Sequence, residues 1–118
     1  MAHSTTTSHL SAEMQKCIDA CDECRAACLA TVTYCLEKGG EHAEPEHIRL
    51  LLDCAEICAT SAGFMLRGSD LHRKVCGVCA DVCERCAESC EAMGDDAQMR
   101  ACANACRQCA KSCRQMAS

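Results

Sequence analysis

The sequence predicts an all-α protein that folds as an antiparallel up-down-up-down four-helix bundle with a cysteine-lined core. Three observations lead to this fold class. The chain has 118 residues and 16 cysteines, and in four segments the cysteines recur in steps of three and four residues, the repeat of one helical face. Breaks containing Gly or Pro separate these segments. Each segment is about 20 to 28 residues long, and short connections between helices of that length favour antiparallel neighbours.

The composition limits the class of protein. A chain of 118 residues has room for one domain with a modest core. Its aromatic side chains are one Tyr and one Phe, so the core must be built from small residues. The formal net charge of −5 offers no basic surface for nucleic acid. No apolar run approaches the roughly 20 residues that cross a membrane. We therefore expect neither nucleic acid nor a membrane among its partners.

The N-terminal segment, residues 1–10, is polar and has no apolar periodicity. We expect a flexible tail there, followed by a single four-helix-bundle metal-binding domain over residues 11–118. The segment lacks the charged and apolar regions of a secretory signal peptide. A cytoplasmic location is therefore expected, and in a reducing compartment a dense cysteine pattern indicates metal binding rather than disulfides.

The first helix is predicted to start after an N-cap at Ser11 and to run to about Lys38, where Gly39 and Gly40 end it. Thr31 occupies the one gap in its cysteine stripe, which covers an arc of about 60°. The metal-ligand candidates on this helix are Cys17, Cys21, Cys24, Cys28 and Cys35.

The second helix is predicted over about Pro45 to Arg67, because proline suits the first helical position. Its candidate ligands are only Cys54 and Cys58. Ser61 and Met65 stand where further thiols would continue the stripe. This half-filled stripe indicates that the two ends of the bundle are not equivalent.

The third helix is predicted over about Asp70 to Met93, with Ser69 as its cap. Asp95 with Gln98 three residues later resembles a capping box that starts the fourth helix. The candidate ligands of the third helix are Cys76, Cys79, Cys83, Cys86 and Cys90. Those of the fourth are Cys102, Cys106, Cys109 and Cys113.

Two explanations without metal were weighed against these stripes. Free cysteine packs well as a small apolar residue, but this explains one or two per helix rather than continuous rows. Disulfides within a row are disfavoured, since neighbours at i,i+3 and i,i+4 have Cβ atoms about 5–6 Å apart and a disulfide needs about 3.5–4.5 Å. Metal binding by the thiolates is the favoured interpretation.

The choice of metal follows from the shape of the thiol array. Zinc and iron–sulfur sites need a few thiolates that converge on one centre. A continuous column suits a soft ion content with two or three shared thiolates, which favours Cu(I). Two alternatives stay open: a buffer for zinc, at about four closed sites, or for another soft metal; and a thiol-redox structural protein. No cysteine is paired with a positioned His, so we expect no enzyme and assign no catalytic residue.

The rows of Cys-x3-Cys and Cys-x2-Cys in all four helices closely resemble those of the bacterial four-helix-bundle copper storage proteins, over residues 11 to 116. The resemblance implies storage of many Cu(I) ions per chain, mostly by pairs of thiolates, and a role in copper homeostasis and detoxification. It also implies a homotetramer of the cytosolic branch. The cysteine-poor second half of the second helix departs from the pattern.

Antiparallel helices would bring His42, His47 and Met93 to one end of the bundle. We expect copper to enter there, because His and Met suit a weaker relay that passes Cu(I) inward to thiolates. A partly exposed histidine of a first helical turn is the alternative for His47. On this polarity Cys90 lies near the opening and Cys76 lies beside the closed, apolar end.

Overall fold

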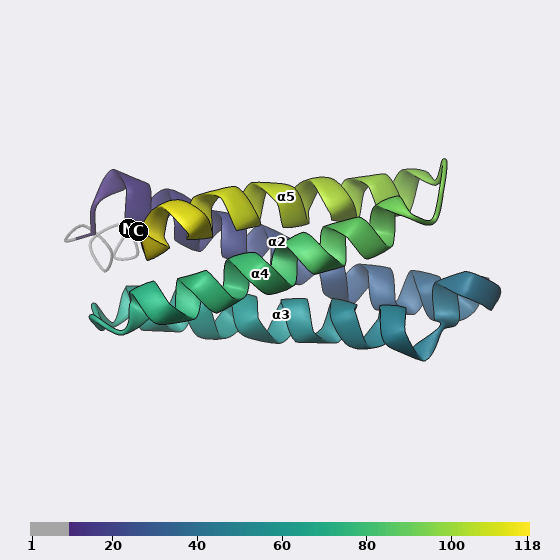
Figure 1. Cartoon of the computed structure of the whole chain (residues 1–118), viewed down its shortest axis with the longest axis horizontal. Helices are drawn as coiled ribbons and strands as arrows, with labels where there is room; N and C mark the ends of the chain where they lie inside the picture. Colours follow the sequence, from purple (N-terminus) through teal and green to yellow (C-terminus); the bar gives the residue numbers. More distant parts are fainter. Residues whose placement is uncertain (1–9) are drawn as a thin grey trace, which may run out of the picture.

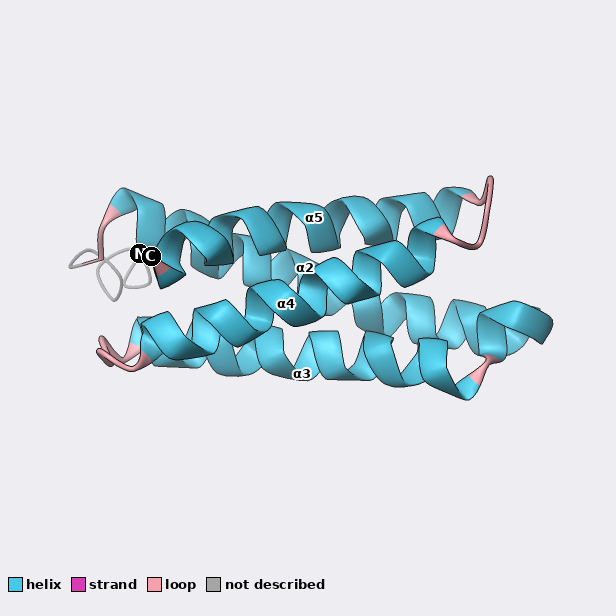
Figure 2. Cartoon of the chain, viewed as in Figure 1, coloured by secondary structure: helices cyan, strands magenta, loops and turns pink. Residues whose placement is uncertain are grey.

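The computed structural model describes residues 10–118, which form a bundle of four long helices (Figure 1). The elements are α2 (Ala12–Lys38), the 3-10 helix η1 (Gly40–Ala43), α3 (Pro45–Leu66), α4 (His72–Glu91) and α5 (Ala97–Ala117). Each long helix packs on two neighbours, in the cyclic order α2, α3, α4, α5. Short connections at alternate ends of the bundle make the chain run up, down, up and down (Figure 2). The predicted fold class is confirmed.

The ends of α2 follow from local sequence as predicted. The hydroxyl of Ser11 accepts a hydrogen bond from the Met14 backbone N–H at 3.1 Å, which satisfies one of the free amides of the first turn. At the other end Gly39 takes a φ of 75° and donates its N–H to the Cys35 carbonyl at 3.0 Å. A side chain with a Cβ rarely adopts this conformation, so glycine stops the helix there.

The start of α4 differs from the prediction. The helix begins at His72 rather than near Asp70, and it ends at Glu91 rather than Met93. Ser69 does not cap it. Instead the Ser69 hydroxyl accepts from the Leu71 N–H at 3.2 Å, and the Ser69 carbonyl accepts from His72 Nδ1 at 2.8 Å. Ser69 thus stabilises a turn that precedes the helix.

The start of α5 is displaced by one residue from the predicted capping box. Asp96, not Asp95, is the N-cap, and its Oδ1 accepts from the backbone N–H groups of Gln98 and Met99 at 3.0 and 3.2 Å. Asp95 pairs with Arg100 on the surface. The Gln98 side chain does not reach back to the cap but donates from Nε2 to Thr31 Oγ1 on α2 at 3.0 Å.

The core of the bundle consists mainly of sulfur and methyl groups. All sixteen cysteines have a relative exposure of 0%, and Ala80, Ala87 and Ala103 lie among them. The largest fully buried side chains are Leu51, Met65 and Met99. Among residues 10–118, Leu10 packs against this core, and residues 1–9 of the predicted tail lie outside the described residues. No helix in the described part of the chain has the length and apolar content of a membrane span.

Candidate metal centre

The cysteines of all four helices meet in one column along the axis of the bundle. Their helical spacing of three and four residues turns each row inward, so that thiols of different helices touch. Cys54 Sγ lies 3.5 Å from Cys83 Sγ and 3.6 Å from Cys24 Sγ, which joins α3 to α4 and to α2. Cys109 Sγ of α5 lies 3.6 Å from Cys21 Sγ. All sixteen cysteines are free thiols.

Four groups of thiols within the described residues have sulfur atoms close enough to share one metal ion. Three of them contain four thiols and one contains three, and within each group all sulfurs lie within 4.8 Å of one another. The groups are Cys21/Cys79/Cys109/Cys113, Cys24/Cys58/Cys83/Cys109, Cys24/Cys28/Cys54/Cys106 and Cys17/Cys76/Cys113. Because Cys24, Cys109 and Cys113 each belong to two groups, the groups form a chain of linked sites.

The column closes between the start of α2 and the end of α5. Cys17 Sγ lies 3.6 Å from Cys113 Sγ, and Cys76 Sγ lies 3.3 Å from the hydroxyl of Ser61. Ser61 therefore contacts one member of the group of three thiols, Cys76. Met65 is fully buried at this end of α3.

At the opposite end the column finishes in a mixed set of donors. Cys35 Sγ lies 3.4 Å from His47 Nε2 and 3.7 Å from Met99 Sδ, and all three side chains are at most 3% exposed. His47 Nδ1 lies 2.7 Å from the Ser89 hydroxyl, which orients the ring so that Nε2 faces Cys35. Thiolate, thioether and imidazole are all soft or borderline donors that suit copper.

Burial sets the protonation of this mixed set. It lowers the pKa of His47, because the charged imidazolium is disfavoured away from water. It raises the pKa of Cys35 to about 11, which keeps the thiol protonated near neutral pH. His47 thus presents a neutral nitrogen donor, whereas Cys35 would have to lose a proton to bind a metal.

The inner thiols influence one another through hydrogen bonds. The pKa of Cys106 is raised, first by its hydrogen bonds to Cys102 and Cys24. The pKa of Cys24 is lowered, first because Cys106 and Cys109 hydrogen-bond to its sulfur, while burial opposes this effect. A thiolate that forms at Cys24 is therefore stabilised by neighbours that keep their own protons.

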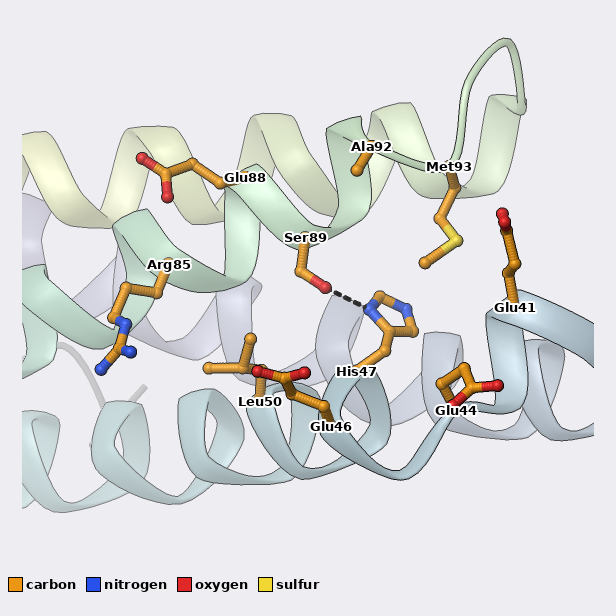
Figure 3. A pocket seen from close by; sticks show the side chains of 10 residues that line it. All are labelled: Glu41, Glu44, Glu46, His47, Leu50, Arg85, Glu88, Ser89, Ala92 and Met93. Atoms are coloured by element: carbon orange, nitrogen blue, oxygen red, sulfur yellow. Dashed lines mark hydrogen bonds between the residues drawn. The ribbon is translucent and has the colours of Figure 1, made fainter.

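A pocket of about 600 Å³ lies between α3 and α4 above His47 (Figure 3). Carboxylates of Glu41, Glu44, Glu46 and Glu88 contribute to its lining, together with Arg85. The Met93 side chain extends from the end of α4 on the wall that faces His47, as Figure 3 shows. We call this cavity the acidic pocket. It leads from solvent to His47 and hence to Cys35.

His42 lies outside the acidic pocket. Its Nε2 is 3.0 Å from Asp96 Oδ2, which also accepts a hydrogen bond from the Tyr34 hydroxyl at 2.8 Å. Burial would raise the pKa of Asp96, but hydrogen bonds from Tyr34, the Met99 amide and His42, with the charge of Lys38, lower it to about 2. Asp96 thereby ties η1 and α2 to the start of α5.

The structure thus brings together the predicted thiols, and it places His47 and Met93 on one pocket but His42 elsewhere. Two residues of this end were not predicted as site residues, Met99 and Ser89. Met99 precedes Cys102 by three residues and lies on its stripe, so helical periodicity was a usable signal. Ser89 gave no such signal, because its role depends on how α4 packs against α3.

Comparison with known proteins identifies the family. The chain matches the copper storage protein family over residues 10–118. It is 40% identical to the cysteine-rich protein YhjQ of Bacillus subtilis over 68 residues, which cover 58% of this chain and 63% of that relative, less than two thirds of its length.

Solved structures extend the match over the bundle. The Nmul_A1745 protein of Nitrosospira multiformis has 53% identity and a TM-score of 0.84, covering 89% of this chain and 94% of its own. Cu(I)-bound copper storage protein BsCsp3 has 40% identity and a TM-score of 0.83, and the match covers 90% of this chain and 99% of that protein. A cytosolic copper storage protein of Streptomyces lividans, in a structure with five coppers, has 32% identity and a TM-score of 0.77, covering 89% and 92%. The resemblance predicted from the cysteine rows is confirmed: this chain belongs to the copper storage protein family.

Proposed function

We propose that this chain is a cytosolic copper store that holds many Cu(I) ions inside the bundle and so limits copper toxicity. The observation that carries the proposal is the column of sixteen fully buried thiols, twelve of which form linked groups drawn from all four helices. Membership of the copper storage family and the similarity to a Cu(I)-bound structure support the same function. The proposed role is storage, and it requires no catalytic residue.

The ligands that we propose are all sixteen cysteines, in a single domain over residues 11–118. Low-coordinate Cu(I) binds to two or three thiolates and tolerates bridging sulfurs. The double membership of Cys24, Cys109 and Cys113 provides such bridges. The column therefore suits a set of linked ions better than a set of separate ones.

We propose that copper reaches the column through the acidic pocket, by way of Met93 and His47. The supporting contact is His47 Nε2 to Cys35 Sγ, since it joins the pocket to the first thiol. His42 contributes to uptake only when it releases Asp96, which it contacts at 3.0 Å.

A zinc buffer is the second candidate, because each group of four thiols has the ligand number of a closed zinc site. Because the groups share thiols, fewer zinc ions can be held at once than the number of cysteines suggests. Only two of the three groups of four, Cys21/Cys79/Cys109/Cys113 and Cys24/Cys28/Cys54/Cys106, have no thiol in common. The expected zinc capacity falls from about four sites, which the number of cysteines alone allows, to two.

We also propose a homotetramer, as in the resemblance. Leu36, Leu71 and Val78 support it, because they are large apolar side chains of the outer surface with 56%, 53% and 52% exposure.

Anaerobic titration of the reduced apo protein with Cu(I), followed by native mass spectrometry, tests the storage function. We expect the number of bound ions to approach 16, the number of thiols, with little change in helical circular dichroism, because the neutral apo core already packs. A parallel titration in which Zn(II) saturates at two ions per chain and Cu(I) stays far below 16 would favour the zinc buffer. A random-coil apo spectrum would contradict the storage function and favour a protein that folds only around its metal.

A further inference from the structure

The size of the thiol groups does not by itself exclude zinc. Two groups of four thiols have no sulfur in common: Cys21/Cys79/Cys109/Cys113 and Cys24/Cys28/Cys54/Cys106. Sulfur–sulfur contacts within them span 3.6 to 3.9 Å. A tetrahedral zinc ion with Zn–S bonds of about 2.3 Å needs sulfurs about 3.8 Å apart. The remaining sulfur pairs of the two groups lie within 4.8 Å, so both groups come close to the dimensions of a zinc site, and another property must decide which ion they hold.

That property is the charge of the complex. A divalent ion held by four thiolates leaves two negative charges in the core. Among residues 10–118 the buried polar side chains are Thr31, His47 and Ser61, and none of them carries a fixed positive charge. His47 makes its hydrogen-bond contacts with Cys35 and Ser89, and neither of these residues belongs to either group of four. A dianionic site in this core therefore has no buried partner charge.

Two arginines of α5 form ion pairs on the surface instead of providing this partner. Arg107 pairs with Glu91, and Arg114 pairs with Asp81 and Glu84. These two arginine side chains are 44% and 48% exposed. An uncompensated charge in an apolar interior is strongly disfavoured, so the core opposes any ion that leaves one behind.

A singly charged soft ion leaves no charge. Each Cu(I) that binds replaces one thiol proton: R–SH + Cu⁺ gives R–S–Cu + H⁺, with no change of oxidation state. Because sulfurs bridge neighbouring ions, each ion gains a second or third sulfur contact without a second deprotonation. At full loading, with one thiolate for each Cu(I), the core is therefore neutral.

We infer that the column selects ions by charge balance: it holds an ion only when the number of thiolates that the ion requires equals the charge of that ion. This inference rests on the proposed storage function and adds its rule of selectivity. A sulfur shared by two ions counts as half a thiolate for each, so Cu(I) and Ag(I) satisfy the rule with two shared sulfurs per ion. Zn(II) fails it, since its closed site uses four thiolates for two charges and no group of four thiols shares all of its sulfurs with another group.

Hg(II) distinguishes selection by charge balance from a simple preference for monovalent ions. It is divalent like zinc, but a linear pair of thiolates satisfies it and leaves a neutral complex. The rule therefore admits Hg(II) at half the number of thiols, whereas a simple preference for monovalent ions would reject it.

The test loads reduced apo protein anaerobically with an excess of Cu(I), Ag(I), Hg(II) or Zn(II), each alone, followed by gel filtration in citrate buffer. Metal per chain, protons released per ion and the isoelectric point are then measured. We expect Cu(I) and Ag(I) to approach 16 ions per chain with one proton each. Hg(II) should reach about half that number with two protons each, and fewer than one Zn(II) should be retained. None of the retained ions should shift the isoelectric point.

Three results would overturn the inference: two Zn(II) retained per chain with a fall in isoelectric point, rejection of Hg(II), or a changed isoelectric point on Cu(I) loading. Failure of Cu(I) to load near the thiol number is a different result, which would reject the storage function itself and this rule with it.

Discussion

His47 Nε2 lies 3.4 Å from Cys35 Sγ, at the point where the acidic pocket meets the thiol column. The two side chains come from facing ends of α2 and α3, and burial holds the imidazole neutral while it holds the thiol protonated. A metal ion can therefore bind His47 before any proton is released, and Cys35 after one is released. On the proposed route through the acidic pocket, His47 is therefore the first nitrogen donor that an incoming ion meets.

Replacement of His47 by Ala is expected to slow Cu(I) uptake severalfold and to leave the final number of ions almost unchanged. It should lower the free energy of unfolding of the apo protein by about 0.5–1.5 kcal/mol, the loss of the hydrogen bond to Ser89. Stopped-flow transfer from a Cu(I) chelator measures the rate. His72→Ala, at the other end of the bundle, is the matched control and should load as fast as the wild type. Equal rates for all three proteins would contradict the route through the acidic pocket.

Replacement of Ser61 by Cys is expected to raise the copper capacity by about one ion. The Ser61 hydroxyl lies 3.3 Å from Cys76 Sγ, so a thiol there would add a further sulfur beside the group Cys17/Cys76/Cys113. Native mass spectrometry at saturation gives the number, and Ser61→Ala, with no added donor, should not exceed the wild type. An unchanged capacity in Ser61→Cys would show that a thiol at position 61 adds no copper site to the closed end.

Replacement of Cys109 by Ala is expected to lower the capacity by more than one ion. Cys109 belongs to two groups of thiols and touches Cys21, Cys58 and Cys113. Cys35→Ala removes an equally buried thiol that belongs to none of the groups, and should cost about one ion. Equal losses in the two variants would indicate separate sites rather than shared sulfurs.

The apo protein is expected to lose stability between about pH 9 and pH 11. Burial raises the pKa of Cys35 from its ordinary value of 9.0 to about 11, so the folded state holds this proton more tightly than the unfolded state does. The stabilisation is complete below pH 9 and is lost as the pH rises through 11. One thiol with this shift contributes on the order of 2 kcal/mol. Urea unfolding across this range measures the loss, and copper-loaded protein, whose thiol protons are already displaced, should not show it.

Replacement of Asp96 by Ala is expected to lower the midpoint of thermal unfolding by about 4–8 °C, because it removes the helix cap and the acceptor for Tyr34. Asp95→Ala is the matched control, because the Asp95 side chain is 97% exposed and its loss should change the midpoint little. Circular dichroism during heating measures both. Equal midpoints would contradict the role of Asp96 as the tie between η1, α2 and α5.

Most of the fold could be predicted because the closely spaced cysteines show which face of each helix points inward. Steps of three and four residues fix the inward face of each helix, and Ser11, Gly39 and Pro45 fix the ends of α2 and the start of α3 through local chemistry. The order of the helices then follows from short connections. These are properties of neighbouring residues, which one sequence displays directly.

The details that could not be predicted depend on contacts between helices. Asp95 and Asp96 are equally plausible caps from sequence, and Asp96 is the cap in a structure where Tyr34 and His42 bind its second oxygen. Gln98 matches a capping box, yet its amide reaches Thr31 across the bundle. Local pattern carries no information about these distant partners, so the start of α5 was predicted one residue too early.

The contact between Cys17 and Cys113 joins residues 96 positions apart in the chain. An ion shared by these two sulfurs would be a cross-link between the first and the last helix, and would remove much of the freedom of the unfolded chain, as a disulfide across so long a loop does. A full molecule would then unfold far less often than an empty one. Proteases digest chains that unfold, so degradation would remove metal-free protein faster than copper-loaded protein. The lifetime of each molecule would then depend on its copper content.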